Sequence, residues 1–151
     1  MEKLTIENLA PYLPYNLRMW DVENERQYIP ELIGIVDNEK IRVTLPRFPS
    51  VTLFEINALK PILFPLSSLT KKKLIPIGLL IRDIEKYKAT YKDNVFAIED
   101  AKDWIRGGMK PVLSLHQCCL IMDYLFSIKA DVFGLIEKGL AIPVTNELNP
   151  Y

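Results

Sequence analysis

The chain has 151 residues, 49% of them apolar, and its 19 Lys and Arg side chains are balanced by 19 Asp and Glu side chains. That length and apolar content suffice for one sizeable core, so intrinsic disorder is excluded and a single globular domain of residues 1–151 is expected. The zero formal net charge lacks the basic excess that is typical of nucleic-acid-binding domains, and the adjacent Cys118 and Cys119 cannot join distant parts of a fold.

The first third of the chain predicts a small antiparallel sheet. A helix of one or two turns begins after Thr5 and ends at the prolines Pro11 and Pro14. Four runs that are rich in β-branched or alternating apolar residues follow, at residues 17–22, 31–36, 41–45 and 51–56. We therefore predict a meander of four strands between Asn16 and Ile56.

The rest of the chain predicts helices. Four segments have helical spacing of apolar residues or helix-capping residues, at 78–88, 98–106, 111–128 and 132–138. The third, Pro111–Ile128, has apolar residues on several sides and is expected to be central and buried. Asp131 is expected to cap the fourth, and residues 140–143 continue in an extended form. The predicted class is α+β, a small N-terminal meander packed against a C-terminal set of helices.

One group of residues has the composition of a nucleophilic site. His116, Cys119 and Asp123 stand at helical spacing, which would bring an imidazole, a thiol and a carboxylate toward one side. Residues on one straight helix project side by side, however, and cysteine is among the most commonly buried residue types. We expect packing instead of catalysis, because one histidine and two neighbouring cysteines also lack the paired spacing of a zinc site.

The carboxylates and glycines do not predict an enzyme either. Glu99, Asp100 and Asp103 have the chemistry of acid–base groups or magnesium ligands, but basic residues intervene, and an exposed helix start is the favoured interpretation. The glycines match no phosphate-binding loop. The sequence therefore predicts a non-enzymatic protein without catalytic, cofactor-binding or metal-binding residues.

The segment Lys60–Lys92 carries eight basic and two acidic residues, which is a local charge of +6 in a neutral chain. With Tyr87 and Tyr91 nearby, it has the composition of a surface that follows a phosphate backbone and stacks bases. A solvated lysine face is the favoured alternative. The side chains that would contact nucleic acid or another partner are Lys71, Lys72, Lys73, Arg82 and Lys86.

Aromatic residues gather in the N-terminal third, at Tyr12, Tyr15, Trp20, Tyr28 and Phe48. They either complete the core of a meander that is too small to be stable alone or form a partner-binding surface. The core is the favoured interpretation, and the sequence leaves both open for Trp20 and the tyrosines.

The sequence predicts a cytoplasmic protein. Residues 1–7 carry two acids where an export signal has a basic start, and the adjacent cysteines suit a reducing compartment. The longest stretch without charge, Pro111–Met122, is shorter than the ~20 apolar residues that cross a bilayer. We expect no membrane partner.

Three segments form a recognisable set, Leu4–Leu17, Leu59–Lys71 and Asp131–Ile142, which together make up about a quarter of the chain. In this order they resemble a family of short, uncharacterised proteins associated with gut bacteria and their phages or prophages. The chain departs from the family pattern where it has Asn16 for glycine, Phe64 for arginine, Ser68 for aspartate, and 128–130 for an aromatic-His-aromatic stretch.

The resemblance implies a phage or mobile-element origin and carries no activity with it. Together with the missing catalytic motifs, it predicts an accessory protein that acts by binding another protein. Nucleic-acid binding through the basic segment Lys60–Lys92 is the alternative function.

Overall fold

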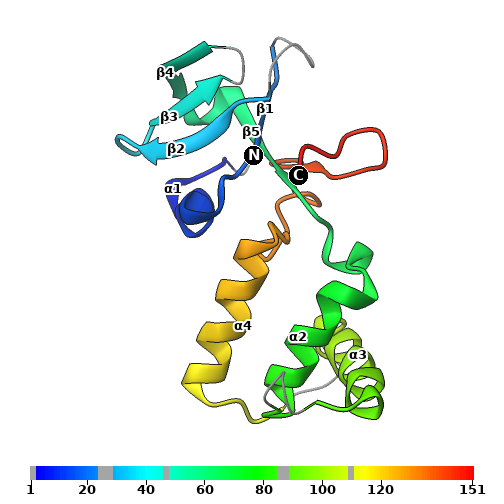
Figure 1. The fold of residues 1–151 in the computed structure, drawn as a ribbon. Helices are drawn as coiled ribbons and strands as arrows, with labels where there is room; N and C mark the ends of the chain where they lie inside the picture. The colour runs from blue at the N-terminus through cyan, green and yellow to red at the C-terminus, as the bar shows by residue number, and fades with distance from the viewer. Residues whose placement is uncertain (1–2, 24–28, 46–47, 85–88, 109–110) are drawn as a thin grey trace. The chain divides into compact units, whose positions relative to one another are not determined.

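The computed structural model describes residues 3–23, 29–45, 48–84, 89–108 and 111–151 (Figure 1). The chain divides into two compact units, a sheet unit of residues 1–65 with 129–151 and a helical unit of residues 66–128. The predicted α+β class is confirmed. The expectation of a single domain stays a prediction, since a compact unit is not by itself an independently folding domain.

The larger sheet of the sheet unit is an antiparallel meander, β2-β3-β4. Its strands are β2 (Glu31–Ile35), β3 (Lys40–Leu45) and β4 (Phe48–Glu55). The alternation that predicted β3 is confirmed, because Ile41 and Val43 are buried and Arg42 is exposed. In the β2–β3 turn, the Asp37 carboxylate accepts the N–H groups of Glu39 and Lys40, each at 2.8 Å.

A second sheet has the order β1-β5-β6. Its strands are β1 (Met19–Asp21), β5 (Leu59–Leu63) and β6 (Ile142–Pro143), with β1 antiparallel and β6 parallel to β5. The prediction of a four-stranded meander is therefore wrong in the sheet to which its first strand belongs, because β1 pairs with β5. The predicted contact with the second strand is confirmed next to β1, where the Leu32 N–H donates to the Leu17 carbonyl at 2.8 Å. The sequence hides β5 because nearly all of its residues are buried, which removes the alternation, and because Pro61 lies inside it. The extended form predicted for residues 140–143 is confirmed at β6.

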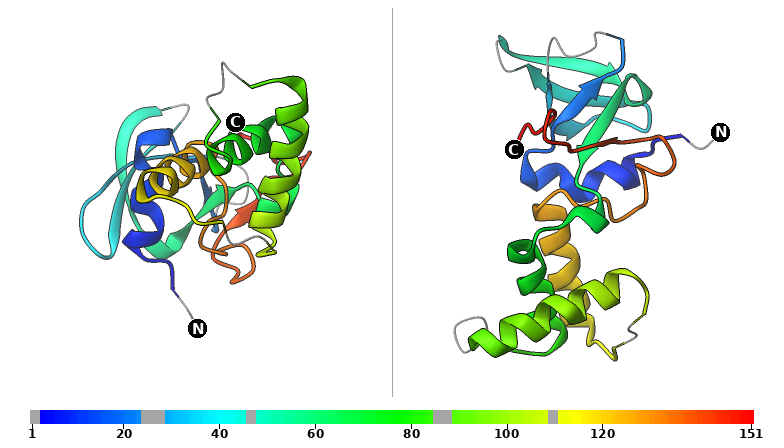
Figure 2. Two further views of the ribbon diagram at one scale, coloured as in Figure 1. Left: turned by 90° about the horizontal axis from the view of Figure 1, so that it is seen from below. Right: turned by 90° about the vertical axis from the view of Figure 1, so that its right-hand side faces the viewer.

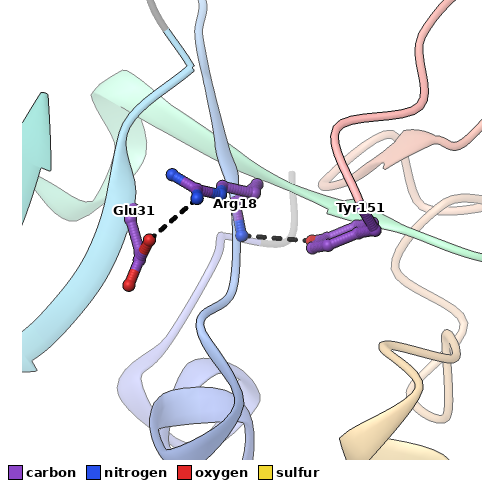
Figure 3. Close-up of polar contacts among 3 residues, drawn as sticks. All are labelled: Arg18, Glu31 and Tyr151. Atoms are coloured by element: carbon purple, nitrogen blue, oxygen red, sulfur yellow. Dashed lines mark hydrogen bonds and ion pairs between the residues drawn. The ribbon is translucent and has the colours of Figure 1, made fainter. Parts of the chain in front are cut away.

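The last residue of the chain links β1 to β5. The Tyr151 hydroxyl donates to the carbonyl of Ile62 at 2.8 Å and accepts the backbone N–H of Arg18 at 3.1 Å. The Arg18 guanidinium in turn forms an ion pair of 3.0 Å with Glu31 of β2 (Figure 3). These contacts join both sheets of the sheet unit, and burial of the hydroxyl raises the pKa of Tyr151.

Two short helices precede the sheets, α1 (Ile6–Leu9) and the 3-10 helix η1 (Ala10–Tyr15), as predicted from Thr5 and the prolines. Within η1, Tyr12 is fully buried, and its hydroxyl donates to the Ala130 carbonyl at 2.6 Å. Tyr12 is therefore a core residue. Tyr15 and Trp20 are half-buried, Tyr28 lies outside the described residues, and the side chain of Phe48 is not among the described ones.

The predicted helix at 132–138 is wrong, because the segment forms consecutive turns. Gly134 has a φ of 65°, a left-handed conformation that interrupts a helix. Asp131 is buried, and its carboxylate accepts the N–H groups of Leu135 at 2.8 Å and Ile136 at 2.9 Å. The predicted capping side chain therefore organises turns instead of a helix.

The helical unit contains α2 (Lys71–Ile81), α3 (Tyr91–Ile105) and α4 (Leu115–Ser127). Two 3-10 turns complete the fold, η2 (Ile56–Ala58) in the sheet unit and η3 (Leu66–Ser68) before α2. The predicted helix boundaries were wrong for α2 and α3, which begin seven residues earlier than expected. Helix α2 passes through Pro76, whose missing N–H is offset by the burial of Leu74, Ile77 and Leu79.

Helix α3 packs across α2 (Figures 1 and 2). At the crossing, a side chain on Gly78 would overlap the backbone of Ala97, so only glycine permits this approach. Among the helices of the described ranges, none has both the length and the hydropathy of a bilayer span.

Candidate interaction surface on α2 and α3

Three consecutive lysines form the first turn of α2. Lys71 and Lys72 are exposed, and Lys73 is half-buried. Consecutive residues on a helix project about 100° apart, so the ammonium groups surround the helix N-terminus instead of lining one face. Cations there oppose the helix dipole, and this first turn contains no acidic residue. The lysine run is thus placed on the surface at a local electrostatic cost.

A groove of about 600 Å³ lies beside this turn. It is lined by Thr70, Lys72, Lys73, Ile75, Pro76, Asn94 and Tyr124. The Tyr124 hydroxyl donates to the carbonyl of Lys73 at 3.1 Å, and burial raises the pKa of this tyrosine. The groove lining therefore combines hydroxyl and amide groups, two cationic side chains and the apolar side chains of Ile75 and Pro76.

Arg82, at the other end of α2, is already engaged within the helical unit. Its guanidinium forms an ion pair of 2.8 Å with Asp100 of α3. The guanidinium carbon also lies 5.3 Å from the centroid of the Phe96 ring, and the Lys92 ammonium lies 5.8 Å from the same ring. Both distances are within the range of cation–π attraction. Lys86, the last of the predicted contact residues, lies outside the described residues.

The N-terminal half of α3 exposes large apolar side chains. Tyr91 is 85% exposed, and Val95 and Phe96 are also exposed. Positions 91 and 95 lie one turn apart and share a side of the helix, and Phe96 projects about 100° around the helix from Val95, on the same side as Lys92. We name the surface of Tyr91, Val95 and Phe96, with Arg82 and Lys92 beside them, the α3 face.

A capping box fixes the start of this face. The Thr90 hydroxyl accepts the N–H of Asp93 at 3.2 Å, and the Asp93 carboxylate accepts the N–H of Thr90 at 2.9 Å. The hydrogen bond from the Thr90 hydroxyl is the main reason that the pKa of Asp93 is lowered. Sequence reasoning missed this helix start, although the Thr90-Tyr-Lys-Asp93 pattern is a signal for it.

The carboxylates singled out in the sequence lie in the second half of α3. The expectation that they begin a helix is therefore wrong. Two of the carboxylates are stabilised by ion pairs, and not by the helix dipole. Glu99 accepts from the Lys102 ammonium at 2.9 Å, which is the main cause of its lowered pKa, and Asp100 pairs with Arg82. Asp103 is exposed.

Helix α4 is less buried than predicted, since only Ile121 and Leu125 are buried in it. Both cysteines are exposed, so the expectation that they pack in a core is wrong. His116 and Asp123 are exposed as well, on the same helix. Within the described ranges, no three His, Cys, Asp or Glu side chains lie close enough together to hold a metal ion.

Charge is divided unequally between the two units. The helical unit carries ten Lys or Arg and seven Asp or Glu residues, and the sheet unit carries nine and twelve. The neutral chain therefore consists of a basic helical unit and an acidic sheet unit. No protein-family model matches the chain, and neither a curated protein nor a solved structure is significantly similar to it.

Proposed function

We propose that the protein is a non-enzymatic accessory protein of a phage or mobile element that acts in the cytoplasm by binding another protein. The observation that supports this function best is the α3 face, where the side chains of Tyr91, Val95 and Phe96 are all exposed. Tyrosine, phenylalanine and arginine are the residue types enriched in interface cores, and a few such side chains supply most of the binding energy. The phage or mobile-element origin rests on the three sequence segments that resemble that family.

The α3 face is suited to binding because its geometry is restrained before a partner arrives. The Phe96 ring contacts both the Arg82 and the Lys92 cation, and Arg82 is itself held by Asp100. The close crossing at Gly78 keeps α3 against α2. Preorganised side chains lose less entropy on association. The chemistry of the surface calls for a partner with an apolar pocket and an acidic rim.

Site-specific photo-crosslinking tests this function. A photoreactive residue at Val95 is expected to give one crosslinked protein adduct in a lysate of the producing bacterium, and Phe96→Ala is expected to abolish the adduct. The matched control places the same residue at the exposed Glu137 of the sheet unit. Equal adducts at both positions, or none at Val95, would contradict the proposal.

Nucleic-acid binding is the second candidate, through Lys71, Lys72, Lys73, Arg82 and Lys86. The exposure of Lys71 and Lys72 and the basic excess of the helical unit favour it. Binding of a fluorescent single-stranded oligonucleotide at several salt concentrations tests it. Lys71→Gln and Lys72→Gln are each expected to reduce the slope of log affinity against log salt by about one. Affinity that is absent, or independent of salt, would eliminate this candidate.

A further inference from the structure

The strand β4 is the outer strand of the β2-β3-β4 sheet, so one of its edges has no neighbouring strand within that sheet (Figures 1 and 2). Two hydrogen bonds show which residues face that edge. The Ile56 N–H donates to the Glu39 carbonyl at 2.7 Å, and the Val36 N–H donates to the Lys40 carbonyl at 3.0 Å. Because the hydrogen-bonding direction alternates along a strand, even-numbered β4 residues bond to β3.

Val51 and Leu53 therefore direct their N–H and C=O groups away from the sheet, and Glu55 directs its N–H group the same way. The Glu55 carbonyl lies at the N-cap of η2 and accepts the first hydrogen bond of that turn. Among the described residues, no hydrogen bond from another segment reaches these groups. Their side chains are exposed too, and Val51 and Leu53 each keep 57% of their surface in solvent. The edge thus offers unpaired backbone groups beside exposed apolar side chains.

This edge lacks most of the features that prevent strand pairing. Natural sheets protect their edges with lysine, proline, bulges or inward-pointing charges. Pro49 precedes Val51 in β4, and the β3–β4 register shifts between the pairs Thr44–Val51 and Leu45–Phe48. Neither feature lies within the regular stretch of residues 51–55. Glu55 is the one charged residue of that stretch. The regular part of the edge is therefore open to another strand.

We propose that the β4 edge pairs with the β4 edge of a second copy of this chain, antiparallel and centred on Leu53. A two-fold axis perpendicular to the sheet places Leu53 opposite the partner's Leu53 and Val51 opposite the partner's Glu55. The outward groups of the regular stretch then form about four backbone hydrogen bonds, since the Glu55 carbonyl is occupied within η2. A pairing centred on Thr52 would instead bring Pro49, which has no N–H, into the ladder.

The charges beside the edge are compatible with this pairing. Glu55 is the cross-strand neighbour of Lys40, and Arg42 is the cross-strand neighbour of Leu53. In the antiparallel arrangement the two Glu55 residues lie at opposite ends of the ladder, so no like charges face each other. A parallel arrangement in register would set Glu55 beside the partner's Glu55, which is unfavourable.

The short ladder limits the strength of the dimer. Stable protein interfaces bury about 1,200–2,000 Å², and a five-residue edge with two exposed apolar side chains provides much less. The dimer is therefore weak and in rapid exchange with the monomer. It forms a continuous sheet in which the exposed faces of both copies lie on the same side.

Sedimentation analysis of the intact chain from about 10 µM to about 1 mM tests this inference. The average mass is expected to rise with concentration from 17.4 kDa toward twice that value. Leu53→Lys is expected to keep the chain monomeric, and the control Ile33→Lys, at an exposed position on β2, is expected to leave the rise unchanged. A monomer throughout the range, or association that Leu53→Lys leaves unchanged, would overturn the inference.

Cysteine crosslinking tests the register separately. In a Cys118→Ser, Cys119→Ser background, Leu53→Cys is expected to yield a covalent dimer on oxidation, and Ile33→Cys is expected to remain monomeric. Circular dichroism of each variant establishes that it is folded before it is compared. Equal crosslinking at both positions would contradict pairing through β4. The inferred dimer does not involve the α3 face, so its test is independent of the test of the proposed function.

Discussion

The substitution Gly78→Ala tests the α2–α3 crossing directly. In the middle of a helix, replacing glycine by alanine normally stabilises a protein by about 0.5–1 kcal/mol. At this position the added carbon would overlap the carbonyl of Ala97 and lie 2.5 Å from its Cα. These atoms belong to a helix backbone, so they cannot rotate away as a side chain can. The two helices would have to separate.

The expected effect is therefore opposite in sign to that of helix propensity. Overpacking of a close contact costs about 1–3 kcal/mol, and separating the helices also reduces the packing of Ile77 and Leu79, which are buried in α2. We expect a net loss of about 2 kcal/mol in the free energy of unfolding. For a chain of this size, that loss lowers the unfolding midpoint by roughly 4–8 °C.

Thermal and urea unfolding followed by circular dichroism measure this loss. The matched control is Gly108→Ala, because a Cβ there meets its nearest atom, the Asp103 carbonyl oxygen, at 3.5 Å. That variant is expected to change the free energy of unfolding by less than about 0.5 kcal/mol. A Gly78→Ala chain that is as stable as the parent, or more stable, would refute the close crossing.

Three further predictions concern the sheet unit and the thiols. Asp131→Ala is expected to lower the free energy of unfolding, measured by urea titration, by about 1–3 kcal/mol, because two backbone N–H groups lose their acceptor. Asp131→Asn keeps one acceptor oxygen and is expected to lower it less in the same titration. Burial raises the pKa of both Tyr12 and Tyr151, so the unfolded chain ionises first as the pH rises. The contribution of these two hydroxyls to stability is then constant below about pH 10 and falls above it, and Tyr12→Phe is expected to reduce that fall. A pH-independent midpoint between pH 9 and about 11 would contradict this reasoning. Both cysteines are expected to react with a thiol reagent in the native chain, and inert thiols would contradict their exposure.

The predictions from sequence succeeded where one face of an element is buried. The alternation of Ile41, Arg42 and Val43 gave β3 and its hairpin, since that sheet has one covered face and one open face. The predictions failed where buried and exposed residues do not alternate along an element. The strand β5 is buried almost throughout, so its sequence has no alternation, and Pro61 argued against a strand. Its non-local pairings with β1 and β6 identify it.

The candidate surface was predictable in part. The lysine run at the start of α2 is visible in the sequence, and its exposure follows from its charge. The ion pair of Arg82 with Asp100 was not predictable, because the two residues are 18 positions apart and meet only through the helix crossing. The exposure of Phe96 was not predictable either, because aromatic residues are usually buried.

The ion pairs also bear on the choice between the two candidate functions. The sequence segment Lys60–Lys92 had a charge of +6, but in the folded chain Arg82 is paired with Asp100. Lys71 and Lys72 remain exposed without an ion pair to another described residue. Two or three phosphate contacts would give a salt slope of only about −1.5 to −2 on a single strand, which is shallow for a nucleic-acid-binding protein. Neutralisation at Arg82 therefore weakens the nucleic-acid candidate, while the same residue, held beside Phe96, strengthens the α3 face as a protein-binding surface.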